Sequence, residues 1–99
     1  MLNSKQKIFL RKYAQKNEIL KFQIGKETLD NNVLSMLNNA ITKHELIKVS
    51  FLKTSLINNE IEALILDISS FLNCDVVQII GRTALFYREN KKLTNKIVF

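Results

Sequence analysis

Residues 76–88, VVQIIGRTALFYR, decide the fold of this sequence. Two apolar runs, Val76–Ile80 and Thr83–Arg88, flank the dipeptide Gly81-Arg82. Glycine at the first central position of a two-residue loop is typical of a type II′ β-hairpin, because glycine adopts a positive φ without strain. The near-continuous apolar run before the turn is typical of a buried strand. The stretch therefore predicts an antiparallel hairpin whose first strand is central in a sheet.

The sequence before the hairpin alternates helix and strand patterns. Apolar residues at helical spacing predict three helices, at about Ser4–Asn17, Thr28–His44 and 58–72. Runs of strand-forming residues predict two further strands, at 21–25 and Leu46–Leu52. Ser4 and Thr28 are the expected N-caps. Lys7 cannot close a capping box with Ser4, and Asn73 can end the third helix in the left-handed conformation.

These elements follow the order α-β-α-β-α-β-β. Strands joined through helices are expected to pair in parallel, and the hairpin adds one antiparallel pair. The predicted fold class is therefore α/β, with a small four-stranded mixed sheet packed with helices. We expect one domain over residues 1–99, with about 90–99 as a C-terminal tail in which Ile97–Phe99 could add an edge pairing.

The charge of the chain is unevenly distributed. Its 99 residues carry a formal net charge of +6. Residues 1–26 contribute +6, residues 27–80 contribute −4, and residues 81–99 contribute +4. If the two ends meet in the fold, they form one basic face, which is typical of proteins that bind polyanions. A solvated surface that keeps the protein in solution is the alternative explanation.

Catalytic chemistry has few candidates in this sequence. The chain has one histidine, His44, expected at a helix end, and one cysteine, Cys74, expected to act as a small apolar residue beside a strand. A single residue of each kind excludes a histidine cluster, a multi-cysteine zinc site and an intramolecular disulfide. We expect no enzyme activity, no metal, no cofactor and no membrane span, and a cytoplasmic location.

Three places hold the candidate contacts for a polyanion. The first is the turn from Gly25 to Thr28, where glycine permits close approach and a helix start beside Lys26 favours an anion. The second is the hairpin tip Gly81-Arg82-Thr83, where Arg82 would project from a rigid turn, and on the last strand an outward Tyr87 beside Arg88 could stack on a base. The third is a set on the first helix, namely Lys5, Lys7, Arg11 and Lys12. Each has a plain structural explanation as well, either an ordinary turn or a solvated face.

Four pieces of sequence, in order, carry a family resemblance. They are Ser4–Lys7 with Leu10-Arg11, then Phe22–Lys26, then His44–Val49, then Val77–Thr83 followed by Leu85–Arg88. Over about residues 2–89 the chain resembles the CRM domain (chloroplast RNA splicing and ribosome maturation) in its bacterial stand-alone, YhbY-like form. The resemblance implies an α/β fold similar to the C-terminal domain of translation initiation factor three, with KH-like features. It also implies a non-catalytic RNA-binding protein associated with precursors of the large ribosomal subunit.

The resemblance places an RNA contact on a GxxG loop after the first strand. Here that loop is Gly25-Lys26-Glu27-Thr28, in which Thr28 replaces the second glycine and Glu27 adds an acid. We therefore expect this loop to bind phosphate more weakly, and the first helix and Arg82 to contribute more of the affinity for RNA. The resulting hypothesis is a monomer that binds ribosomal RNA or the pre-ribosomal large subunit, with no small-molecule substrate. The alternative is a protein-interaction module that docks on a ribosomal protein or an assembly factor.

Overall fold

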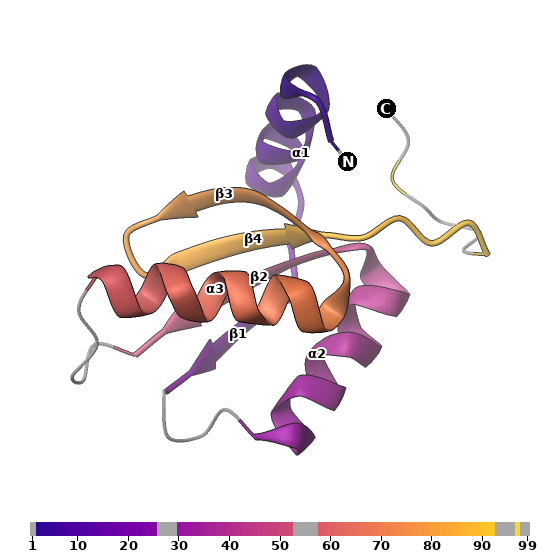
Figure 1. The fold of residues 1–99 in the computed structure, drawn as a ribbon. Coiled ribbons are helices and arrows are strands. Elements are labelled where there is room, and N and C mark those ends of the chain that lie inside the picture. Colours follow the sequence, from indigo (N-terminus) through magenta and orange to yellow (C-terminus); the bar gives the residue numbers. More distant parts are fainter. Residues whose placement is uncertain (1, 26–29, 53–57, 93–96, 98–99) are drawn as a thin grey trace.

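A computed structural model of the chain describes residues 2–25, 30–52, 58–92 and 97. The elements in chain order are α1 (Ser4–Lys16), β1 (Lys21–Ile24), α2 (Asn31–His44), β2 (Leu46–Phe51), α3 (Asn58–Leu72), β3 (Asp75–Ile80) and β4 (Thr83–Tyr87). The predicted order of elements and the four-stranded mixed sheet of an α/β fold are both confirmed. Figure 1 shows α3 in front of the sheet and α1 behind it.

The pairing of the strands differs from the expectation. The order is β1-β2-β4-β3, with β1 and β2 parallel and β4 antiparallel to both of its neighbours. The sheet thus has two antiparallel pairs instead of one, and β3 is an edge strand, so the prediction of a central Val76–Ile80 strand is wrong. Its apolar run has another cause: Val76 packs with the side chains of one face and Val77 with those of the other. Cover on both faces accounts for the apolar start of this edge strand, whereas Ile79 and Ile80 at its end are exposed.

The hairpin between β3 and β4 has the backbone that the sequence predicts. Gly81 has φ +57°, and the positive-φ residues other than glycine in the described segments are Glu45 and Asn73. Arg82 is therefore not in the left-handed region, as a type II′ turn requires. A Cβ at Gly81 would meet no atom within 4 Å, so the backbone conformation, and not space, requires the glycine. The φ of +51° at Asn73 likewise agrees with the predicted end of α3.

The N-caps of α1 and α2 are not the predicted residues but others within two positions of them. Asn3, not Ser4, caps α1, and it forms a capping box in which Asn3 and Gln6 exchange side-chain-to-backbone hydrogen bonds of 2.8 and 3.0 Å. Asp30, not Thr28, caps α2, because its carboxylate accepts from the Val33 N–H at 2.9 Å. Each replacement is a residue type with the same capping ability as the one expected, so the sequence pattern alone could not choose between them.

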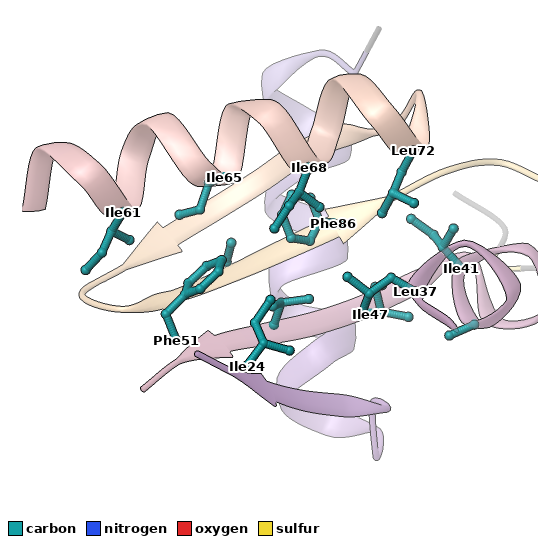
Figure 2. Close-up of a cluster of buried hydrophobic side chains, with 13 residues drawn as sticks. Ile24, Leu37, Ile41, Ile47, Phe51, Ile61, Ile65, Ile68, Leu72 and Phe86 are labelled. Carbon is teal, nitrogen blue, oxygen red and sulfur yellow. The ribbon is translucent and has the colours of Figure 1, made fainter. Parts of the chain in front are cut away.

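The main core lies between the sheet and the pair α2 and α3. Figure 2 shows α3 presenting Ile61, Ile65, Ile68 and Leu72 to a sheet face that includes Ile47, Phe51 and Phe86. Ile24 from β1 and Leu37 and Ile41 from α2 complete the labelled cluster. Burial of this apolar surface is the principal stabilisation of the fold. The opposite face of the sheet packs against α1 and Ile97.

A second, smaller core joins α1 to the C-terminal segment. Leu10 is fully buried against Leu46, Tyr87 and Ile97. Glu45 is also fully buried, and its carboxylate accepts from the backbone N–H groups of Asn90 at 2.8 Å and Ile97 at 2.7 Å. Ile97 therefore belongs to the core and lies in no strand, in contrast to the expected tail, and Val98 and Phe99 lie outside the described residues.

Candidate nucleic-acid interface

The sheet face that carries α1 changes from apolar to polar along the strands. Near one end, Leu46 and Tyr87 are paired across β2 and β4 and lie beneath Leu10. The next row across the sheet pairs Lys21 with Lys48, Lys48 with Leu85, and Leu85 with Gln78. The row after it consists of Gln23, Ser50, Thr83 and Ile80. The helix thus covers the apolar end of the face and leaves a polar end beside it.

A cleft of about 280 Å³ lies between α1 and this polar end. Its lining comes from one side of α1 and from all four strands: Arg11, Ala14, Gln15, Lys21, Lys48, Gln78, Ile80, Thr83 and Leu85. We call it the cationic cleft, because three of these side chains are cations and none is acidic. Its only basic residue on the helix is Arg11, whereas the two lysines come from β1 and β2.

The two lysines of the cleft are direct neighbours. Lys21 and Lys48 are register partners on parallel strands, which lie about 4.8 Å apart, and their side chains leave the same face of the sheet. Like charges placed directly opposite each other destabilise a sheet. Neither lysine forms a salt bridge with a carboxylate of the described residues. Such a pair is suited to an anionic ligand, which would neutralise both charges.

Arg11 is held over the opposite side of the cleft. With the Gln78 amide oriented so that its oxygen faces the guanidinium, Arg11 donates to that oxygen from Nε at 2.9 Å and from Nη2 at 3.2 Å. The hydrogen bonds connect α1 to the edge strand β3 and fix the direction of the guanidinium. They leave Nη1 of Arg11 with no hydrogen bond to the described residues, so the arginine can still contact a phosphate.

The other predicted cations of α1 separate into two groups. Lys7 precedes Arg11 by one helical turn and so lies on the same side of α1 as the cleft. Lys5 lies at a different hollow, which it forms with Asn3, Gln6 and Phe9. Lys12 is exposed and does not line the cleft. Of the four candidates on this helix, the structure therefore places Arg11, with Lys7 beside it, at the cationic cleft.

Gly25 and Arg82 lie at one end of the sheet, on either side of β2. The N–H of Phe51 donates to the Arg82 carbonyl at 2.8 Å, and the N–H of Leu52 donates to the Ile24 carbonyl at 2.9 Å. Two strand spacings, or about 10 Å, thus separate the end of β1 from the hairpin tip. Figure 1 shows the arrowhead of β1 and this hairpin at the same end of the sheet. Lys26 and Thr28, the rest of the expected loop site, lie outside the described residues.

The start of α2 differs from the phosphate site expected there. The helix begins at Asn31, six residues after Gly25, and Asp30 occupies its N-cap. The Asp30 carboxylate already accepts the Val33 N–H, which is one of the donors that a phosphate would need. An acid at this position also repels a phosphate. The N-terminus of α2 is therefore a poor anion site, for a reason that the predicted Thr28 cap concealed.

Arg88 has a structural role that conflicts with the prediction of an RNA contact. Its Nη1 donates to Asn38 Oδ1 at 2.9 Å and to the Leu72 carbonyl at 2.6 Å, and its Nη2 donates to Thr42 Oγ1. These acceptors belong to α2 and to the last residue of α3. The guanidinium thus ties the two helices together on the face away from the cationic cleft, so we leave Arg88 out of the interface.

Sequence reasoning missed three polar side chains of the cleft, Lys21, Lys48 and Gln78, and named Thr83 only as part of the hairpin tip. Their signal is the alternation within the strands, where Lys21 alternates with Phe22, and Lys48 with Ile47 and Val49. A polar residue at every second position marks a sheet face that is not covered by apolar side chains. The pattern indicates an open face, but it cannot place residues of different strands in one row, because that requires the strand order.

The catalytic candidates of the sequence lie apart from the cleft. His44 is exposed in the last turn of α2, as expected. Cys74 is half-buried against the main core, and burial raises the pKa of its thiol from 9.0 to about 12, so it stays protonated at neutral pH. In the described segments, no three histidine, cysteine or acidic residues are placed to hold a metal ion. Nor does any helix there have the length and apolar character needed to cross a membrane.

A basic helix that crosses a mixed sheet and leaves a cationic cleft beside it defines an α/β domain suited to a polyanion. The model of the CRS1/YhbY (CRM) domain matches residues 2–88. The probable RNA-binding protein YqeI of Bacillus subtilis (strain 168) is 38% identical over 94 residues, which are 93% of each chain. The solution structure of the hypothetical protein SAV1595 from Staphylococcus aureus, a candidate RNA-binding protein, superimposes with a TM-score of 0.73 at 33% identity, over 93% of each chain. The chain belongs to the CRS1/YhbY (CRM) domain family.

Proposed function

We propose that this protein binds RNA through the cationic cleft and the adjoining end of the sheet. The observation that carries the proposal is the row in which Lys21 and Lys48 lie side by side across from Arg11, with no acidic side chain among the described residues that line the cleft. The descriptions of both relatives as RNA-binding support it. In this mechanism the cations neutralise phosphates, which positions the RNA without reading its sequence.

The loop at 25–28 belongs to the same proposed surface. Gly25 and Arg82 are about two strand spacings apart at the sheet end, so Lys26 and Thr28, which follow Gly25, are proposed to extend the phosphate contacts from the cleft. Lys7 is proposed to extend them along α1. Lys5 and Lys12 contribute to the general positive field and not to the cleft itself.

The affinity for RNA should depend strongly on salt. About four phosphate contacts, made by Arg11, Lys21, Lys48 and a further lysine, give an expected slope of log K against log salt of roughly −3. Fluorescence anisotropy with a labelled structured RNA, between about 50 and 200 mM salt, measures this slope. A slope near zero would show that neutralisation of phosphates is not the mode of binding.

The finer proposal is that the RNA is the precursor of large-subunit ribosomal RNA and that binding assists ribosome assembly. The family resemblance motivates it, and crosslinking in cell extract tests it. We expect the RNA fragments attached to the protein to come mainly from large-subunit precursors. Purification with and without nuclease separates this role from the alternative of docking on a ribosomal or assembly protein. Association that resists nuclease, with no enriched ribosomal fragment, would contradict the proposal.

A further inference from the structure

The cationic cleft has two sides of different chemistry. Its β1–β2 side carries Lys21 and Lys48, whereas its β3–β4 side carries Thr83, Ile80 and Gln78. Ile80 is 65% exposed, the most exposed large apolar side chain of the described residues, although it lies among polar neighbours. Leu85 of the same lining is buried, at 4% exposed. The β1–β2 side of the cleft thus suits phosphates, and the β3–β4 side, where Arg11 is bonded to Gln78, offers apolar contact together with hydrogen-bonding groups.

The shape of the cleft limits what can enter it. Its volume of about 280 Å³ lies just below the range of small-molecule sites, so it can admit one nucleobase with its sugar but not a double helix. Lys48, Gln78 and Thr83 are only half-exposed, and α1 forms a wall beside them. The convex surface of an RNA duplex can reach the rim of such a hollow but not its floor. A base that has left its stack can reach both.

We propose that the cationic cleft holds one unpaired nucleotide of the bound RNA, an inference that rests on the RNA binding proposed above. The phosphates on either side of the nucleotide lie over Lys21, Lys48 and Arg11. The base lies over β3 and β4, where Ile80 contacts one of its faces. Gln78, whose amide nitrogen is left to donate because its oxygen accepts from Arg11, is placed to hydrogen-bond with the edge of the base. Thr83, whose hydroxyl donates to Ser50 Oγ at 3.3 Å, is placed there as an acceptor. The protein therefore prefers RNA with a bulge or an internal loop over a continuous duplex.

Ile80 and Ile79 offer a matched pair of variants for the test. Ile80 pairs with Thr83 and faces the cleft, whereas Ile79 pairs with Ala84 and faces the α3 side, where it is 42% exposed. Ile80→Ser removes the apolar contact from the cleft, and Ile79→Ser makes the same change on the opposite face. Both residues are exposed, so their substitution should leave the thermal midpoint of the full chain nearly unchanged.

The experiment uses three labelled RNA hairpins: fully paired, with one bulged nucleotide, and with an abasic site at that bulge. We expect the bulged RNA to bind about tenfold more tightly than the paired one, and the abasic RNA to lose most of that preference, although its phosphates remain. Ile80→Ser should lower the preference to about twofold, whereas Ile79→Ser should preserve it. All four bases are tried in the bulge.

The outcomes distinguish this inference from the proposal on which it depends. Equal, salt-dependent binding of all three hairpins would overturn the nucleotide site and leave RNA binding intact. A preference for the bulge that survives in the abasic RNA would also overturn it, because the preference would then come from backbone flexibility. Failure to bind any hairpin would overturn both the site and the proposed function.

Discussion

Lys48→Glu is expected to weaken RNA binding at least about 30-fold while the protein remains folded. The introduced carboxylate would lie opposite Lys21 and pair with it, so one substitution removes two cations from the cationic cleft. The slope of log K against log salt should fall in magnitude by about two. An oppositely charged cross-strand pair stabilises a sheet by about 0.2–1 kcal/mol, so the thermal midpoint should hold or rise by a few degrees.

Lys43→Glu is the matched control for this substitution. It makes the same change in net charge, but Lys43 is exposed in the last turn of α2, the helix that packs on the opposite face of the sheet. We expect it to weaken binding only slightly, through the general field of the protein. Equal losses for the two variants would mean that net charge, and not the cleft, determines the affinity. A midpoint lowered by Lys48→Glu would mean that the lysine is structural.

Arg88→Met should have the opposite profile, a large loss of stability with little change in RNA binding. The substitution keeps an apolar stem but leaves the Leu72 carbonyl and the Asn38 side chain without their donor. Hydrogen bonds to a charged group contribute about 1.5–3 kcal/mol, so we expect the free energy of unfolding to fall by about 3 kcal/mol. For a domain of this size the thermal midpoint should then fall by roughly 10–20 °C. Thermal unfolding followed by circular dichroism measures the change.

Arg88→Lys provides the comparison for Arg88→Met. An ammonium retains the charge but cannot reproduce the planar fork that reaches α2 and α3 together, so most of the loss should remain. Both variants should bind RNA like the unchanged protein at a temperature well below their midpoints. If instead Arg88→Lys were as stable as the unchanged protein and Arg88→Met bound RNA poorly, the arginine would belong to the interface after all.

The fold could be predicted largely from periodicity, but the strand order could not. Helical and strand patterns identify seven elements because each buries one face or stripe, and Gly81 marks the hairpin. They do not say which strand of the hairpin joins β2, since Val76–Ile80 and Thr83–Tyr87 are both rich in apolar residues. That choice depends on how α1 and α3 share the two faces of the sheet, which is a property of the assembled fold.

The candidate site was less predictable, for the same reason. Arg11 could be found because it is one of several basic residues on the first helix. Lys21 and Lys48 are separated by a whole helix in the sequence, and only the register of β1 with β2 makes them neighbours. Arg88 is the reverse case, a residue predicted at the interface whose guanidinium is bonded to two helices. An arginine at the end of a strand is exposed by default, and nothing in the sequence indicates that the ends of two helices supply its acceptors.

The position of β4 between β2 and β3 determines when the sheet can form during protein synthesis. The strand that emerges last from the ribosome is the one whose two edges hold the sheet together. Before it emerges, β1 and β2 can form only an isolated parallel pair, and β3 has no partner. The row from Lys21 to Gln78 does not exist in such a nascent chain, because Leu85 of β4, which pairs with both Lys48 and Gln78, has not yet been made. The chain therefore cannot present its proposed RNA surface while its first strands are still the only ones made.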